Sequence, residues 1–196
     1  MIGRFALVAT ALLCGGAFAA AGWQRGPAET ALQFAERVLA VAPDAEPDAL
    51  EARWNGRPVI FASYMHPSGQ DSTDRLVVML DKAADGSYRK IDVTTGEEEG
   101  GAARVEAIGF ANADRDPAQE LIVILSWNTE HYDVSGTFYE VRIFDDAAVR
   151  GQLTYLKAVS AHFGGDCDCT WRDGKTKHFR FKTIAAVKAE LKRMGF

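Results

Sequence analysis

The sequence lacks the short motifs that mark the best-known catalytic and nucleotide-binding sites. It contains no G-x-S-x-G, no H-E-x-x-H and no glycine-rich phosphate loop. Serine hydrolases of the nucleophile-elbow type, zinc peptidases and P-loop proteins are therefore not indicated. No nucleophile stands at a recognisable spacing from a general base. The sequence leans toward a protein that is not an enzyme, and it leaves the question of catalysis open.

Basic residues are also scarce relative to acidic ones. Lys and Arg number 22 against 27 Asp and Glu, which gives a formal net charge of −5. Nucleic-acid binding requires a basic surface that neutralises phosphates, so the composition argues against a nucleic-acid partner. The charge is uneven, because residues 172–196 contain eight Lys or Arg and two acids. We interpret this segment as a solvated basic face, and its use stays open.

Cysteine is rare, with three residues in the chain. No Cys-x-x-Cys is present, so a thioredoxin-type site is not indicated. Cys167 and Cys169 stand one residue apart in the stretch GGDCDC, which we expect to be a loop. They could form a disulfide that staples this loop, a quiet thiol pair, or a redox-active pair.

The one long apolar run lies at the N-terminus. Met1 to Arg4 carry a positive charge, residues 5–14 are apolar, and Ala17-Phe18-Ala19 fits the small-x-small cleavage pattern. This arrangement is typical of a secretory signal peptide over residues 1–19, and it is too short for a membrane span. We therefore expect a periplasmic or secreted protein with a flexible leader over 20–27 and no membrane span after cleavage. The remaining residues, 28–196, are enough for a single domain.

Hydrophobic periodicity predicts a helix at each end of that domain and strands between them. Apolar residues at helical spacing predict an amphipathic helix over 28–41. Residues 47–54 are expected to add a helical turn. Apolar or alternating runs predict strands over 58–65, 75–82, 87–94, 103–110, 120–127 and 137–144.

The C-terminal part follows the same reasoning. Residues 152–163 are interpreted as a strand running into a short helix, and the alternation in 177–182 predicts another strand. Thr183 can cap a last amphipathic helix that ends at Gly195. The expected fold class is α+β, with a mainly antiparallel β-sheet that is a meander or propeller-like and an amphipathic helix at each end.

The stretch 110–125, FANADRDPAQELIVIL, carries the strongest local pattern. Oxygen-bearing side chains at alternate positions precede a purely hydrophobic run, which reads as a strand covered on both faces. The pattern resembles the D-x-D-x-D-G-x-x-D-L loop of FG-GAP and VCBS-type repeats, in which the loop binds calcium and the hydrophobic run is a core strand. The resemblance implies that the calcium ligands are Asn112, Asp114, Asp116, the carbonyl group of Ala118, and Glu120.

Two positions depart from that family's pattern. Pro117 stands where the family has glycine, and proline cannot adopt the left-handed turn that glycine allows. Asn112 replaces an acid, which lowers the charge of the site. The alternative is therefore a loop that keeps the turn and the strand without binding an ion. Calcium is the one candidate cofactor.

A second group of candidate binding residues follows the hydrophobic run. It combines aromatic and polar side chains on a loop beside a predicted central strand, where binding residues often gather. The group comprises Trp127, Asn128, Glu130, His131, Tyr132 and Asp133. The alternative is a plain hairpin loop with Trp127 in the core.

These features together favour an exported, non-catalytic binding protein with a protein partner. A secreted β-rich domain with an acidic loop and the aromatic run YEVRIFD at 139–145 resembles periplasmic inhibitor or immunity proteins that bind cell-wall hydrolases. Two alternatives stay open: a redox-active or enzymatic protein centred on Cys167 and Cys169, and a calcium-stabilised structural domain.

Overall fold

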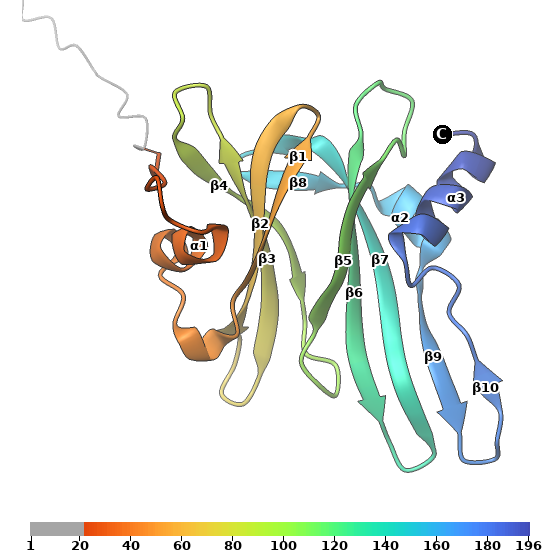
Figure 1. The fold of residues 1–196 in the computed structure, drawn as a ribbon. Helices are drawn as coiled ribbons and strands as arrows, with labels where there is room; N and C mark the ends of the chain where they lie inside the picture. Colours follow the sequence, from red (N-terminus) through yellow and green to blue (C-terminus); the bar gives the residue numbers. More distant parts are fainter. Residues whose placement is uncertain (1–21) are drawn as a thin grey trace, which may run out of the picture.

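A curled, ten-stranded sheet forms the body of the protein in a computed structural model, which describes residues 22–196 (Figure 1). Eight strands follow the order β1-β2-β3-β4-β8-β7-β6-β5, and β9 extends the sheet from β7 with β10 beside it. All pairings are antiparallel except that of β4 with β8. The strands are β1 Asp48–Trp54, β2 Arg57–Pro67, β3 Thr73–Lys82, β4 Tyr88–Gly96, β5 Arg104–Ala111, β6 Glu120–Glu130, β7 Val134–Val149, β8 Gln152–Tyr155, β9 Gly165–Trp171 and β10 Thr176–Lys177.

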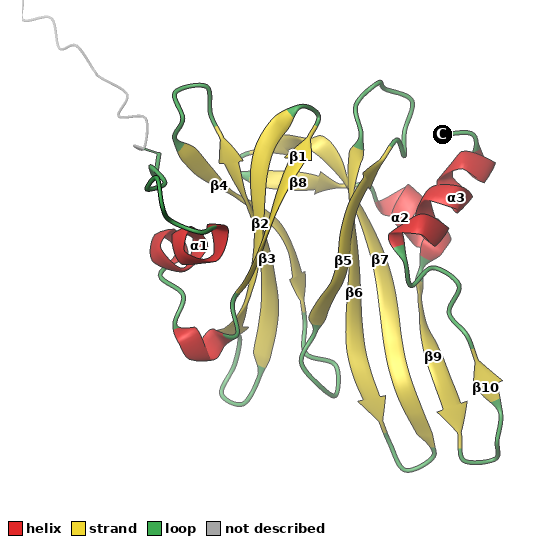
Figure 2. Ribbon diagram, in the orientation of Figure 1, coloured by secondary structure: helices red, strands yellow, loops and turns green. Residues whose placement is uncertain are grey.

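Three hydrophobic clusters hold the sheet, one inside the curl and two outside it. The inner cluster joins both halves of the sheet, from Trp54 and Met79 on one side to Leu125 and Phe144 on the other. The outer face of β2 and β3 is covered by helix α1, Ala31–Leu39. The outer face of β6 and β7 is covered by α2, Lys157–Phe163, and α3, Ile184–Met194 (Figure 2). Strand β6 is buried on both faces, as its unbroken hydrophobic run predicts.

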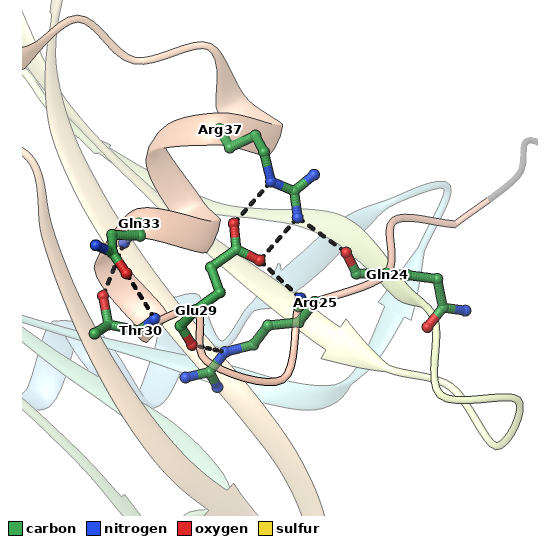
Figure 3. Close-up of polar contacts among 7 residues, drawn as sticks. Gln24, Arg25, Glu29, Thr30, Gln33 and Arg37 are labelled. Atoms are coloured by element: carbon green, nitrogen blue, oxygen red, sulfur yellow. Dashed lines mark hydrogen bonds and ion pairs between the residues drawn. The ribbon is translucent and has the colours of Figure 1, made fainter.

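Polar contacts fix the start of α1 (Figure 3). Thr30 and Gln33 form a reciprocal capping box, in which each side chain accepts a hydrogen bond from the other residue's backbone N–H. Glu29 accepts two hydrogen bonds from Arg37, at 2.7 and 2.9 Å. Arg37 also reaches the carbonyl oxygen of Gln24, so the segment before α1 lies against the helix. A short 3₁₀ turn, Pro43–Ala45, then leads into β1.

The C-terminal helix begins and ends where the sequence predicts. The side chain of Thr183 accepts a hydrogen bond from the backbone N–H of Ala186, and Gly195 closes the helix in the left-handed region, with φ 96°. The predicted strand and short helix over 152–163 are confirmed as β8 and α2.

The sheet curls far enough to bring its two edge strands, β1 and β5, toward each other without pairing them. Their C-terminal ends meet through the stacked rings of Trp54 and Phe110, whose centroids lie 5.9 Å apart. The α+β class with a mainly antiparallel sheet and terminal helices is confirmed. The architecture is a curled half-barrel, and the described residues form no propeller blade arrangement.

Three local predictions are wrong. Residues 47–54 do not form a helical turn but pair with β2, because Asn55 and Gly56 both have positive φ and make the tight turn of a β-hairpin. Residues 177–182 do not form a full strand, since β10 ends at Lys177. The chain leaves the sheet there so that Phe179 and Phe181 both pack into the cluster under α3. The stretch GGDCDC is not a loop: Gly164 caps the end of α2, and the other five residues lie in β9, paired with β7.

The predicted signal peptide over 1–19 lies outside the described residues. Within residues 22–196, none of the helices has both the length and the apolar character needed to cross a membrane.

Candidate functional site

The acidic loop between β5 and β6, residues 112–119, is folded by its own polar side chains. The backbone N–H of Asp116 donates to Asp114 Oδ1 at 2.8 Å, and the N–H of Ala118 donates to Asp116 Oδ1 at 2.7 Å. The Asn112 side chain donates to the carbonyl oxygen of Asp116 at 2.6 Å. The loop closes without any residue at positive φ, so Pro117 does not prevent the turn.

Glu120, the first residue of β6, is the buried end of this loop. Its side chain is fully buried, and Oε2 accepts a short hydrogen bond from the backbone N–H of Ala113. The other oxygen, Oε1, is buried without a hydrogen-bond partner among the described residues. Burial, reinforced by the nearby carboxylates of Asp114 and Asp116, raises the pKa of Glu120 to about 7. An orphaned carboxylate oxygen in a fold is costly unless something else satisfies it.

The geometry of these carboxylates fits one hard cation. Ligand oxygens of Asp114, Asp116 and Glu120 all lie within 4.8 Å of one another. Two oxygens bound to one calcium ion at about 2.4 Å can be no further apart than about 4.8 Å. Bound there, a divalent cation would satisfy Glu120 Oε1 and offset the repulsion within the loop. Asn112 and Ala118, the other predicted ligands, lie in the same loop and take part in its hydrogen bonds.

The β1–β2 turn, at the other edge of the sheet, is hydrogen-bonded to the acidic loop. Trp54 Nε1 donates to the carbonyl oxygen of Gln119 at 2.5 Å. The Asn55 side chain pairs with the same residue, donating to its carbonyl oxygen at 3.0 Å and accepting from its N–H at 2.9 Å. Asn55 also lies 3.4 Å from a carboxylate oxygen of Asp146. No sequence pattern singles out Asn55 and Asp146, because Asn55 is 64 residues from Gln119 and 91 residues from Asp146 in the chain.

The raised pKa of Glu120 predicts a pH effect in the chelated protein. A carboxyl whose pKa is about 7 when folded and 4.5 when unfolded stabilises the fold fully below pH 4.5, and that contribution is lost as pH rises through 7. We expect Glu120→Gln to remove this loss of stability. The variant should therefore have a larger free energy of unfolding than the wild type at pH 8 but not at pH 4. Denaturant unfolding of both proteins in EDTA measures the difference. A difference in unfolding free energy that does not change with pH would contradict the raised pKa of Glu120.

A second feature is the projecting tip, formed by the β6–β7 turn (residues 131–133) and the β9–β10 turn (residues 172–175). In Figure 1 these two hairpins extend side by side beyond the rest of the sheet. Strands β7 and β9 pair from Glu140↔Gly165 to Val134↔Trp171, and the N–H of Arg172 donates to the carbonyl oxygen of Asp133 at 2.9 Å. The two turns are therefore held together as one unit.

Tyr132 is the outermost large side chain of the tip. It is 87% exposed, more than any other large hydrophobic residue in the described chain. The guanidinium group of Arg172 lies over its ring, 4.8 Å from the centroid. The sequence singled out Tyr132 but not Arg172, since their proximity depends on the pairing of β7 with β9.

The other predicted binding residues divide by position. Asn128, Glu130, His131 and Asp133 lie on the end of the β6–β7 hairpin, and all four are exposed. Trp127 points the other way: it is 2% exposed, belongs to the inner cluster and donates from Nε1 to the carbonyl oxygen of Glu97 at 2.7 Å. Its place in the structure is that of a core residue.

Cys167 and Cys169 form a disulfide within β9. Cys169 is 3% exposed and packs against Gly136 of β7, where a side chain would collide with the backbone and sulfur of Cys169. The flanking Asp166 and Asp168 are paired with Lys177 and Lys182, which lowers the pKa of both carboxyls. These contacts tie β9 to the segment that leads into α3.

The disulfide closes a very short loop, so we expect it to add little stability. For a loop of three residues, the chain-entropy relation gives about 1.6 kcal/mol. The double variant Cys167→Ser, Cys169→Ser is expected to fold and to lose about 1–2 kcal/mol of unfolding free energy in urea titrations. A loss several times larger would show that the bond organises β9. Titration of the wild-type pair against glutathione separates a structural bridge from the redox-active alternative.

Comparisons of the chain with protein-family models, with curated proteins and with solved structures found no match. The site must therefore be interpreted from its own residues.

Proposed function

We propose that the protein is an exported, non-catalytic binding protein that contacts another macromolecule through the projecting tip. The observation that carries this proposal is Tyr132, a large aromatic side chain that is 87% exposed at the end of two paired hairpins. Binding surfaces are enriched in Tyr and Arg, and Tyr132 and Arg172 lie together at this tip.

The construction of the tip supports this role. Residues that bind partners commonly lie on loops held by a rigid scaffold. Here the two turns are joined by the β7–β9 ladder and by the hydrogen bond from the N–H of Arg172 to the carbonyl oxygen of Asp133. Arg172 restricts the Tyr132 ring before any partner arrives. Such preorganisation reduces the entropy that is lost on binding.

The sharper form of the proposal names the partner as a muramidase-like cell-wall hydrolase, which the protein inhibits. A narrow, rigid projection with an aromatic end is suited to entering a substrate cleft. The test is size-exclusion chromatography of the purified protein with a panel of muramidases, together with their rate of peptidoglycan hydrolysis. We expect one member to co-elute and to lose activity. If no muramidase forms a complex and none is slowed, the hydrolase partner is rejected.

Export is tested separately from binding. Expression of the full chain in a Gram-negative host, followed by mass spectrometry of the periplasmic fraction, is expected to show the chain cleaved after Ala19. Recovery of intact residues 1–196 in the cytoplasm would reject export.

A calcium-stabilised domain is the second candidate, and it is compatible with the first. The specific observation in its favour is the buried, unpartnered Oε1 of Glu120 beside Asp114 and Asp116. Trp54 is bonded to the end of this loop, so it can sensitise terbium bound in place of calcium. We expect tryptophan-excited terbium emission that calcium displaces and that Glu120→Gln abolishes. Glu36→Gln, which replaces a half-buried acid on α1, is the matched control.

A further inference from the structure

The open end of the half-barrel beside the acidic loop contains a cavity of about 590 Å³, which we call the barrel mouth. Its wall is built from the ends of β2, β3, β4 and β7, together with Asn55 and Gly151 in neighbouring turns. The volume lies within the range of small-molecule sites, which often occupy the mouths of β-barrels. Met79 and Ile91 of the inner cluster form its apolar floor.

Charged side chains point inward at this end of the barrel. Arg57, Asp81 and Arg89 each stand two residues from a member of the inner cluster on their own strand, so they face the same side of the sheet. Asp81 is buried, with 3% of its side chain exposed, whereas the side chains of Arg57 and Arg89 are 43% and 65% exposed. Lys90 and Asp146 also line the mouth, so its charged groups together have a net charge of +1.

The guanidinium groups of Arg57 and Arg89 make few hydrogen bonds within the protein, and these are long. Arg57 Nη1 lies 3.3 and 3.4 Å from the oxygens of Asp81, and Arg89 Nη2 lies 3.4 Å from one of them. Charge-assisted hydrogen bonds are normally about 2.7–2.9 Å long. Within residues 22–196, the remaining nitrogens of both groups make no hydrogen bond. Arg57 is nevertheless held in place, with its guanidinium group over the ring of Trp54.

A second cavity offers a comparison, because its arginine makes more hydrogen bonds, and shorter ones, than Arg57 or Arg89. The cavity between β4 and β7, about 650 Å³, contains Arg142. That guanidinium group donates to Glu140 at 2.7 and 2.9 Å, to Thr94 Oγ1 at 2.8 Å and to the carbonyl oxygen of Thr95 at 2.6 Å. Arg142 therefore joins the two halves of the sheet, and four of its five N–H donors are used within the protein. The barrel mouth differs because its arginines converge while keeping donors free.

We propose that the barrel mouth binds a small organic anion, whose carboxylate or phosphate group is held by Arg57 and Arg89 and whose apolar body rests toward Met79 and Ile91. Planar guanidinium groups recognise both kinds of anion through paired N–H donors. The buried carboxylate of Asp81 keeps the two arginines close together before the ligand arrives. This site is distinct from the projecting tip, and it does not depend on the proposed protein partner.

The test is isothermal titration calorimetry with octanoate, octyl phosphate and octan-1-ol, each below its micellar concentration. We expect at least one anion to bind saturably and the alcohol to bind at least about tenfold more weakly. The two anions distinguish a carboxylate site from a phosphate site. Arg57→Gln and Arg89→Gln are each expected to weaken the anion at least about tenfold, as expected for loss of a charged hydrogen-bond pair. Arg104→Gln, at the exposed start of β5, is the matched control and should bind normally.

Arg57→Gln removes one partner of a buried carboxylate, so a readout on the wild type is also needed. Amide NMR spectra with the same anion are expected to shift at Ala147, Ala148 and Gly151, which line the mouth. The proposal is overturned if neither anion binds, if octan-1-ol binds as well as the anions, or if the shifts lie elsewhere. Unchanged affinity in folded Arg57→Gln and Arg89→Gln also overturns it.

Discussion

Calcium is expected to raise the melting midpoint of the EDTA-treated protein by about 5–10 °C. An ion present at about a hundred times its dissociation constant adds about 2.7 kcal/mol to the stability of the native state. For a chain of this size, each kcal/mol shifts the midpoint by about 2–4 °C. The gain arises because the ion satisfies Glu120 Oε1 and relieves the repulsion among the carboxylates of the acidic loop.

Two substitutions make this prediction specific. Glu120→Gln and Asp116→Asn are expected to lose most of the calcium-dependent shift, while Glu36→Gln should retain it. Differential scanning calorimetry, with and without calcium, measures all four proteins. A wild-type midpoint that does not move when calcium replaces EDTA rejects the cation site and favours the alternative of a loop without an ion. Because the loop is already closed by its own hydrogen bonds, that result would leave the fold unaffected.

Tyr132→Ala is expected to weaken the complex with a muramidase partner by about 30-fold to 1,000-fold. Truncating a central aromatic anchor of an interface typically costs about 2–4 kcal/mol, and 1.4 kcal/mol corresponds to about tenfold in the dissociation constant. The fold itself should be almost unaffected, since Tyr132 is 87% exposed and the contact described for its ring is the guanidinium group of Arg172. Surface plasmon resonance, with the partner identified by co-elution, measures the loss.

The matched control for this experiment is Tyr155→Ala, which removes another exposed tyrosine, 44% exposed, from β8. Arg172→Gln keeps the tip folded but frees the Tyr132 ring, so we expect a smaller loss than for Tyr132→Ala. Equal affinities for the wild type and Tyr132→Ala would show that binding, if present, uses another surface.

The sequence predicted those parts of the fold whose signals are local. The uniform run of β6 and the caps of α3 depend on neighbours in the chain, and both are confirmed. Residues 47–54 were more difficult, because their Ala, Leu and Glu residues favour a helix. The hairpin turn at Asn55 and Gly56 overrides that preference through seven cross-strand pairs with β2.

The candidate sites were predictable only in part, for the same reason. The acidic residues of the loop and Tyr132 could be picked out by composition and spacing. Their partners could not, because Asn55 approaches the acidic loop only once the sheet has curled, and Arg172 approaches Tyr132 only once β7 has paired with β9. No pattern in the sequence predicts the barrel mouth. Arg57, Asp81 and Arg89 come from three strands, and nothing in their spacing indicates that they converge.

The parallel contact between β4 and β8 is a single residue pair, Asp92↔Gln152, although it lies in the middle of the strand order. Each half of the sheet has its own outer cluster and its own covering helix or helices. The inner cluster, Arg142 and the hydrogen bond from Trp54 to the acidic loop supply further links between the halves. Hydrogen–deuterium exchange should therefore divide the protein into two cooperative units, with the amides at this junction exchanging before those in the centres of β3 and β6.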